Sequence, residues 1–517
     1  MNKPGFLQFG LTGEKASRKA RIAADLVFLS VGFLFFVLPY FFPDVTFIYS
    51  LSPWVWITAF LAYLRINDSK KSVIIFFLVF LAANELRYRN CLGSAYSGYS
   101  VMLLVVVAMV YFIPFLAEFI YRRIGSTFWF IFVFPTARVL IELFMAVTRL
   151  GGQFNLMLSE VNDDWLLQDA ALYGEFVISF LICLIPSVTL YLLFRKKKRK
   201  RSIIACLVVI LLIIPMHFYG KHRLDHERMA DTYVTMAWSE GIDSAGSMGG
   251  ESVAYPYEQI SSYVKTTIEE AAAGGAGLLT YVEEAFFVSD TEAETLIEET
   301  CAKAKECGIY VLLTLETYDD DENDDGLEHN KAVFIDPEGN ILSIYNKHNL
   351  VPIIEDLWTV QSRDLPQSHE VTIDGQTFIL SYTICYDGDF STFVQHMDNN
   401  TTVYIDPSWD WEEIQDLNYR MLTIRGVENG VTVFKPTRDG YTTVTDMYGR
   451  TVSKTHSNET DDILVNYVSI PLLRTNTLYK HIADHINYGY LAFGIFLVLL
   501  RIIVNIKRKK KKEAAAL

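Results

Sequence analysis

The stretch SYTICYDGDF, residues 381–390, joins a strand-favouring segment to two reactive side chains. The run from Tyr382 to Ile384 consists of aromatic and β-branched residues, which predicts a strand that ends at Cys385. An acid, Asp387, follows two residues later, and the chain has 6 cysteines in 517 residues. Cys385 is therefore either a small core residue or a nucleophile held at the end of a strand.

This strand is one of several that alternate with helical segments between residues 220 and 485. The other strands are predicted at 232–238, 277–284, 309–316, 401–410 and within 431–452, and the helices at 257–273 and 291–306. A hairpin is expected at 331–347, with its turn at residues 338–340. Strands that alternate with helices pack in layers, so this region is predicted to be an α/β domain.

The rest of the chain is too apolar for an ordinary soluble protein. Hydrophobic residues make up 51% of the sequence and aromatic residues 14%, and they gather in long runs. Eight runs have about the 20 residues that a membrane-spanning helix needs. They lie at 24–43, 46–65, 72–90, 101–121, 128–148, 170–194, 202–219 and 486–506. The third is the weakest, because Glu85 and Arg87 interrupt it.

Basic residues mark alternate loops between these runs. Clusters of lysine and arginine precede the first run and follow the second, fourth, sixth and eighth, the strongest being RKKKRKR at 195–201 and KRKKKK at 507–512. The positive-inside rule then predicts that both termini are cytoplasmic. The chain divides into a transmembrane domain at 1–219, an extracytoplasmic domain at 220–485, and a last helix with a basic tail at 486–517.

Charge and cysteine spacing exclude several function classes. The net charge of −15, despite the basic clusters, leaves the 220–485 domain strongly acidic, which argues against a nucleic-acid partner. No Cys/His spacing predicts a zinc site or a disulfide scaffold. The acidic stretch from Asp321 to Gly326 resembles the start of a calcium loop, but its twelfth position is Ala332 rather than glutamate. We therefore predict no metal and no cofactor.

Three strand ends carry the parts of a covalent acyl-transfer site. Glu283 and Glu284 close one strand, Lys347 follows the hairpin, and Cys385 ends the strand described above. A carboxylate can take the proton of a thiol, and a nearby cation stabilises the oxyanion that forms when the thiolate attacks a carbonyl. Each of these residues alone is more typical of a structural or solvated position. Spacing alone leaves both interpretations open.

The segments around these residues resemble a known family. YVEEA, YNKHNLVPIIED and ICYDGDF occur in the order of the Glu-Lys-Cys triad of the nitrilase superfamily. Within that superfamily they are most similar to apolipoprotein N-acyltransferases, and KHNLVP is the most specific motif. TIRGVENG, TNTLYKHIAD and GGQFNLMLSE extend the resemblance. It implies a nitrilase-like αββα sandwich attached to a multi-span helical membrane domain.

The resemblance also implies a set of site residues. Cys385 would be the nucleophile, Glu283 the general base and Lys347 the stabiliser of the transition state. Residues expected to support the site or bind substrate are Glu355, Tyr386, Asp387 and Trp358. Asp387 stands where the family usually has glutamate, and YVEE replaces the usual Trp-Pro-Glu. Glu284 is therefore a second candidate for the base.

The implied reaction moves an acyl chain from a phospholipid, through a thioester on Cys385, to the amino group of a diacylated lipoprotein. The arm at 349–360, which includes Trp358, would enter the membrane interface or else pack on the core. Among acids at membrane depth, Glu142 is expected to pair with Arg138, and Glu175 to frame a lipid entrance. The alternatives are a membrane-tethered amidase with the same triad and a non-enzymatic membrane scaffold.

Overall fold

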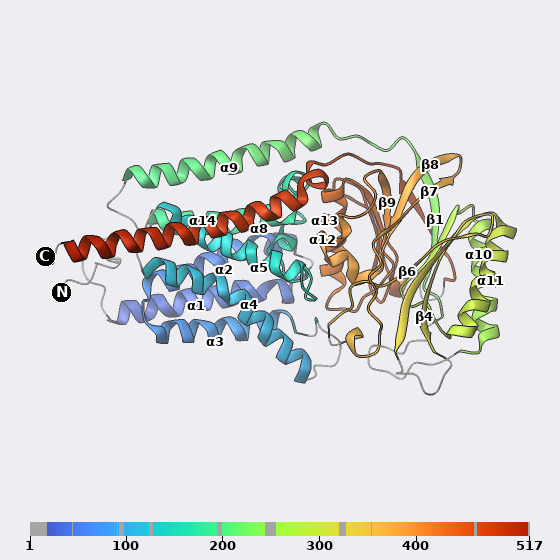
Figure 1. Cartoon of the computed structure of the whole chain (residues 1–517), viewed down its shortest axis with the longest axis horizontal. Coiled ribbons are helices and arrows are strands. Elements are labelled where there is room, and N and C mark those ends of the chain that lie inside the picture. Colours follow the sequence, from blue (N-terminus) through green and yellow to red (C-terminus); the bar gives the residue numbers. More distant parts are fainter. Residues whose placement is uncertain are drawn as a thin grey trace.

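The computed structural model describes residues 18–514 of the chain. Within that range it leaves out residues 44, 90, 92–97, 124–127, 194–198, 243–254, 320–326, 353 and 460–462. A helical bundle forms one end of the elongated molecule, and a layered α/β region forms the other (Figure 1). The first described helix begins, and the last one ends, at the end of the bundle away from the α/β region.

The bundle consists of long, mainly apolar helices. They are α1 (Arg18–Phe41), α2 (Thr46–Ile66), α3 (Lys70–Arg87), α4 (Gly98–Arg123), α5 (Val133–Ala146), α8 (Glu175–Leu193), α9 (Arg199–Asp225) and α14 (Leu478–Ala514). Among the described residues, 7 helical segments are long and apolar enough to cross a membrane. They coincide with seven of the eight predicted spans. The exception is α3, whose charged residues are Lys70, Lys71, Glu85 and Arg87.

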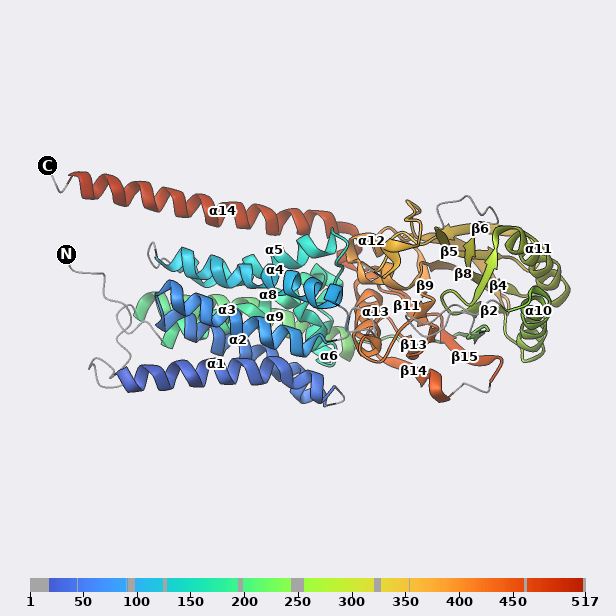
Figure 2. The ribbon, with the colours of Figure 1, turned by 90° about the horizontal axis from the view of Figure 1, so that it is seen from below.

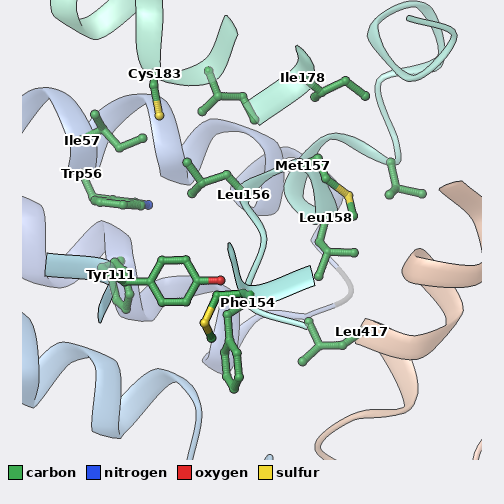
Figure 3. Packing of buried hydrophobic residues seen from close by; sticks show 14 of the residues in the cluster. Trp56, Ile57, Tyr111, Phe154, Leu156, Met157, Leu158, Ile178, Cys183 and Leu417 are labelled. Atoms are coloured by element: carbon green, nitrogen blue, oxygen red, sulfur yellow. The ribbon is translucent and has the colours of Figure 1, made fainter. Parts of the chain in front are cut away.

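Short helical segments close the bundle at the end that faces the α/β region. These segments are η2 (Leu156–Glu160), α6 (Asp164–Leu167) and α7 (Ala170–Tyr173). A further short segment, η1 (Phe128–Phe132), precedes α5 and packs on the parts of α8 and α14 that lie farther from the α/β region. Figure 3 shows Leu156, Met157 and Leu158 of η2 packed among bundle residues such as Trp56 and Ile178. Leu417, which comes from the α/β region, lies beside Leu158 in the same cluster. One hydrophobic cluster therefore continues from the bundle into the α/β region.

Three acids at membrane depth are fully buried and paired with arginines. The Arg138 side chain donates to Glu142 at 2.7 Å, which confirms the predicted pair. Glu118 accepts from Arg65 at 2.7 Å. The expectation that Glu175 frames a lipid entrance is wrong, because it is 0% exposed and pairs with an arginine of the α/β region at 3.0 Å. Burial of an acid in this way requires a partner charge, and the sequence offers no local one at Glu175.

The α/β region contains two mixed sheets. The first has the order β15 (Asn466–Pro471), β1 (Tyr233–Ser239), β2 (Leu278–Tyr281), β4 (Tyr310–Tyr318), β5 (Glu328–Ile335), β6 (Ile341–Asn346), with β3 (Phe286–Ser289) also on β4. The second has the order β14 (Thr451–His456), β13 (Tyr441–Thr445), β11 (Thr432–Lys435), β9 (Thr401–Ile405), β8 (Gln376–Tyr382), β7 (Gln367–Ile373). A short pair, β10 (Ser408–Trp409) and β12 (Thr437–Arg438), lies beside them.

Helices cover the outer face of each sheet. Helices α10 (Tyr257–Ala273) and α11 (Asp290–Cys307) lie on the first sheet, at the end of the molecule farthest from the bundle (Figure 1). Helices α12 (Ser391–Val394) and α13 (Gln415–Asn429) lie between the second sheet and the bundle (Figure 2). Leu312 of β4 and Val403 of β9 belong to one buried cluster between the sheets. This is the αββα arrangement that the resemblance implies, and the predicted fold class is confirmed.

Candidate active site

Cys385 lies at a tight turn directly after a central strand. Strand β8 ends at Tyr382, and a 3-10 turn begins at Cys385. The backbone φ of Cys385 is +46°, in the left-handed region that residues with a side chain seldom adopt. Its N–H donates to the carbonyl oxygen of Pro407 at 2.9 Å, which holds this conformation. A strained backbone conformation persists only where the surrounding structure holds it in place, and such conformations are concentrated at functional sites.

The lysine and two glutamates of the predicted site form one buried cluster. Lys347 follows β6, and its Nζ donates to Glu283 Oε1 at 2.6 Å and to Glu355 Oε1 at 2.5 Å. Glu283 follows β2, and its other oxygen accepts from the N–H of Trp409 at 2.9 Å. The Cys385 thiol faces the carbonyl oxygen of that same Trp409 at 3.9 Å. The backbone of Trp409 thus lies between the thiol and the carboxylate.

The electrostatics of the cluster set the protonation of the thiol and the ammonium. Burial disfavours the charged form of Lys347, but Glu283 and Glu355 outweigh it and hold the lysine pKa well above its usual value. Burial raises the pKa of the Cys385 thiol well above its usual value, Glu283 raises it further, and Lys347 opposes both. At neutral pH the resting thiol is therefore protonated, so a base must remove its proton before it can attack.

Asp387 accepts hydrogen bonds from residues on both sides of Lys347 in the sequence. Its Oδ2 accepts from the hydroxyl of Tyr345 at 2.6 Å. Its Oδ1 accepts from the backbone N–H and the side chain of Asn349, at 2.7 and 2.9 Å. Tyr345 and Asn349 lie two residues on either side of Lys347, so Asp387 fixes the segment that carries the ammonium. The shorter side chain of aspartate reaches both partners.

Tyr386 and the arm after Lys347 lie at the edge of the site. The hydroxyl of Tyr386 donates to the carbonyl oxygen of Arg149, in the segment after α5, at 3.1 Å. In the arm, Val351 is 7% exposed and its N–H donates to Glu355 Oε2 at 2.7 Å. Leu357 is 70% and Trp358 38% exposed. Val351 therefore packs on the core, while Leu357 and Trp358 face outward.

Asn330 is a site residue that the sequence analysis missed. It lies on β5, and its side-chain amide donates to Glu283 at 2.9 Å and to Glu284 at 2.8 Å. Its carbonyl oxygen accepts from the N–H of Lys347 at 2.9 Å. The signal was present in the predicted hairpin, because antiparallel pairing of 331 with 346 sets residue 330 opposite residue 347.

Three carboxylates of the site lie close enough to share a cation. One oxygen each from Glu283, Glu284 and Glu355 lies within 4.8 Å of the others. The ammonium of Lys347 already lies against two of them. Glu284 has a φ of +50° and a pKa raised well above the usual value by burial and then by Glu283. Burial and the neighbouring carboxylate therefore both favour the neutral form of this carboxyl. The acidic stretch 321–326 lies outside the described residues.

Comparisons with known proteins identify a family that part of the chain resembles. Residues 245–478 match the model of the carbon-nitrogen hydrolase family. Apolipoprotein N-acyltransferase 2 of Treponema denticola is 23% identical over 210 residues, which are 36% of this chain and 38% of that protein. Apolipoprotein N-acyltransferase of Rickettsia prowazekii is 26% identical over 216 residues, 38% of this chain and 42% of that protein. The chain thus spans about two fifths of the length of these relatives.

Solved structures of amidases are also similar. An amidase from Nesterenkonia sp. has 16% sequence identity and a TM-score of 0.40, with 51% of this chain and 98% of that chain covered. A second amidase structure, NitN, has 18% identity and the same TM-score of 0.40. The part of the chain that matches the carbon-nitrogen hydrolase family is thus joined to described helices that are long and apolar enough to cross a membrane.

Proposed function

We propose that this protein is a membrane acyltransferase that moves an acyl chain from a phospholipid to the N-terminal amine of a diacylated lipoprotein. The observation that carries the proposal is the buried Glu283–Lys347–Glu355 cluster beside a strained Cys385, in a domain that packs directly on candidate membrane helices. The distant similarity to apolipoprotein N-acyltransferases supports the choice of substrates. Both substrates are lipids, which accounts for a catalytic domain built on a membrane bundle.

In the first step Cys385 attacks an ester carbonyl of the phospholipid. Glu283 takes the thiol proton as the sulfur–carbon bond forms. The ammonium of Lys347 stabilises the oxyanion of the tetrahedral intermediate, and its two carboxylate partners keep it charged. When the ester carbon–oxygen bond breaks, the lysophospholipid alkoxide leaves with the proton from Glu283. The products are a thioester on Cys385 and a lysophospholipid.

In the second step the lipoprotein amine attacks the thioester. Glu283 takes the proton of the attacking amine, the carbon–nitrogen bond forms, and the carbon–sulfur bond breaks. The same proton then passes to the departing thiolate, so the enzyme returns to its starting state. Water competes with the amine for the thioester. Cys385 and Lys347 are buried, and a site that excludes water favours attack by the amine over hydrolysis.

The proposed topology has both termini in the cytoplasm and the catalytic domain, residues 220–485, on the extracytoplasmic side. Two observations support it. The basic tail at the end of α14 lies at the end of the bundle opposite the α/β region (Figure 1). The exposed Leu357 and Trp358 belong to the arm that leads away from Lys347. In this proposal residues 1–219 form the transmembrane domain, and residues 486–517 form the last transmembrane helix with its basic cytoplasmic tail. The exposed arm residues meet the acyl chains at the membrane surface.

The test is to incubate the purified protein in detergent with a phospholipid and a synthetic diacylated lipopeptide. We expect the lipopeptide to gain the mass of one acyl chain and Cys385 to carry an acyl thioester, both measured by mass spectrometry. Cys385→Ala should lose both products. Cys301→Ala is the matched control, because Cys301 is a half-buried cysteine on the distant helix α11 and should retain both.

Other outcomes assign a different function. A thioester with release of free fatty acid and an unchanged lipopeptide indicates a lipid-directed hydrolase. Absence of a thioester with every phospholipid offered, in protein that unfolds cooperatively, removes the chemical basis of the proposal. Amide substrates would then be tested next, and a scaffold role would remain if these were also left intact.

A further inference from the structure

The turn that carries Cys385 is contacted by the bundle side of the molecule. We name residues 385–390 the Cys385 loop. The segment between α5 and α8 lies against it. Besides the Tyr386 contact with Arg149, the hydroxyl of Thr392, just past the loop, donates to the carbonyl oxygen of Ala146 at 2.9 Å. The position of the loop is thus determined by more than the sheet from which it emerges.

Two glycines of that segment allow the close approach. A Cβ on Gly152 would lie 2.9 Å from the carbonyl oxygen of Asp389, a backbone atom that cannot move freely. Gly151 has a φ of +55°, and a Cβ there would lie 3.0 Å from the hydroxyl of Tyr386. Only glycine accommodates both the conformation and the contact without strain. This is the physical reason for the Gly-Gly pair at the start of GGQFNLMLSE.

A buried ion network makes the third connection. Arg425 of α13 donates from Nε to the carbonyl oxygen of Gly388, in the Cys385 loop, at 3.1 Å. Its Nη2 donates to Glu175 of α8 at 3.0 Å, and its Nη1 donates to Glu428. Glu428 also accepts from the N–H of Glu175 at 2.6 Å. The three side chains are 0% exposed.

The guanidinium of Arg425 connects Glu175 to the Cys385 loop. A guanidinium is planar and presents its donors in a fixed fork, so Glu175 and the carbonyl oxygen of Gly388 cannot move independently. Buried ion pairs are weak evidence for stability, because desolvation of the charges offsets their attraction. One arginine bonded to two carboxylates and a loop carbonyl is better explained by positioning than by stabilisation.

We propose that Glu175 and Arg425 are positioning residues through which helix α8 of the bundle sets the geometry of the Cys385 loop. The reactivity of the Cys385 thiol then depends on the membrane part of the chain, although no bundle residue takes part in the chemistry. The proposal rests on the proposed function only in treating Cys385 as the reactive group. Its test therefore uses thiol reactivity rather than acyl transfer.

The experiment measures the rate at which iodoacetamide alkylates Cys385 in the full-length protein in detergent, between about pH 6 and pH 10. Peptide mass spectrometry separates Cys385 from the other cysteines. Glu175→Gln keeps the shape of the side chain and leaves Arg425 paired with Glu428. We expect this variant to alkylate about tenfold more slowly and with a shifted pH profile, because small displacements of a reacting group have large effects on rate.

Glu118→Gln is the matched control. Glu118 is also 0% exposed and paired with a buried arginine, Arg65, but that pair has no bond to the Cys385 loop. We expect it to lower the unfolding temperature while Cys385 reacts at the wild-type rate. Arg425→Lys keeps one positive charge for the two carboxylates without the fork. It should therefore unfold near the wild-type temperature and still alkylate slowly.

The proposal is overturned if Glu175→Gln and Arg425→Lys alkylate Cys385 at the wild-type rate with the wild-type pH profile. It is also overturned if Glu118→Gln slows alkylation as much as Glu175→Gln does, since the effect would then be general destabilisation. If the proposed acyltransferase function is wrong, the measurements differ from those that overturn the positioning proposal. The wild type would then form no acyl thioester, while the difference between Glu175→Gln and Glu118→Gln in alkylation would persist.

Discussion

At the residue scale, three carboxylates of the site, those of Glu283, Glu284 and Glu355, lie close together, and the ammonium of Lys347 pairs with two of them. Lys347 contacts Glu283 and Glu355 directly, and Glu284 is tied to Glu283 through the amide of Asn330. Burial raises the pKa of Glu355 to about 7, against the lowering effect of Lys347. A buried cluster with a surplus of carboxylates keeps part of them protonated near neutral pH. The two adjacent glutamates of the YVEE motif consequently have different tasks.

Substitution of these two glutamates separates the candidates for the general base. We expect Glu283→Gln to abolish thioester formation on Cys385, because this carboxylate contacts both Lys347 and the Trp409 backbone that faces the thiol. General-base catalysis is worth roughly a hundredfold to ten-thousandfold in rate. Glu284→Gln is the matched control, and its rate should stay within about tenfold of wild type. The rates are measured by intact-protein mass spectrometry. The reverse order of the two variants would assign the base to Glu284.

At the scale of elements, the site is assembled by the ends of β2, β6 and β8, which come from two different sheets. Hydrogen bonds fix the segments that follow two of these ends. Asp387 fixes the segment after β6, and Pro407 fixes the start of the Cys385 loop. The last residue of the 3-10 turn, Asp389, is 1% exposed, and one of its carboxylate oxygens has no hydrogen-bond partner among the described residues.

The buried Asp389 should make the stability of the protein depend on pH. Burial raises its pKa from 3.8 to about 7, while Arg425 opposes and Asp410 adds to the rise. Because the folded pKa lies above the unfolded one, the folded state binds more protons between these values. This contribution is complete below about pH 4 and is lost as pH rises through about 7, at up to about 1.4 kcal/mol per pH unit.

The measurement is the thermal unfolding midpoint in detergent between about pH 5 and pH 8. We expect Asp389→Asn to flatten the fall in this midpoint relative to wild type, because it removes the carboxyl that must lose its proton. The exposed Asp398→Asn is the control and should reproduce the wild-type curve. A wild-type slope in Asp389→Asn would show that this carboxyl does not titrate in the folded state in that range.

At the scale of the whole molecule, the α/β region and the bundle pack into one structure. Leu417 of α13 lies in the same core as η2, and Arg425 bonds to Glu175 of α8. The face of the domain that carries the Cys385 loop is turned toward the bundle, while α10 and α11 cover the opposite face (Figure 2). The Cys385 loop therefore lies on the side of the α/β region that packs on the bundle.

The proposed topology can be tested on intact cells. Cysteines introduced as Glu338→Cys, in the exposed turn between β5 and β6, and Lys510→Cys, in the basic tail, mark opposite ends of the molecule. We expect a membrane-impermeant maleimide to label Glu338→Cys in intact cells and Lys510→Cys only after permeabilisation, as the positive-inside rule requires. Labelling is detected by gel shift. Labelling of both positions in intact cells would place the tail outside and refute the proposed orientation.

The sequence by itself determined most of the elements and their order. Helix α10 occupies the predicted range 257–273, and the predicted strands 232–238 and 309–316 are β1 and β4 to within two residues at each end. Hydrophobic periodicity and run length are local properties, so they can be read along the chain. Strands β7 and β15 were missed, because half-buried edge strands lack a continuous apolar run.

Only the tertiary structure decided which distant residues meet. The sequence motifs pointed to Glu283, Lys347 and Cys385. Only the folded structure shows that Trp409 lies between Cys385 and Glu283 and that Asn330 bonds to Glu283. The same is true of the ion pair of Glu175 with Arg425. Glu175 and Arg425 are 250 positions apart, and neither has a local feature that names the other. The physical reason is that a buried charge is stabilised by whichever opposite charge the packing of the layers brings to it, and spacing along the chain does not encode that choice.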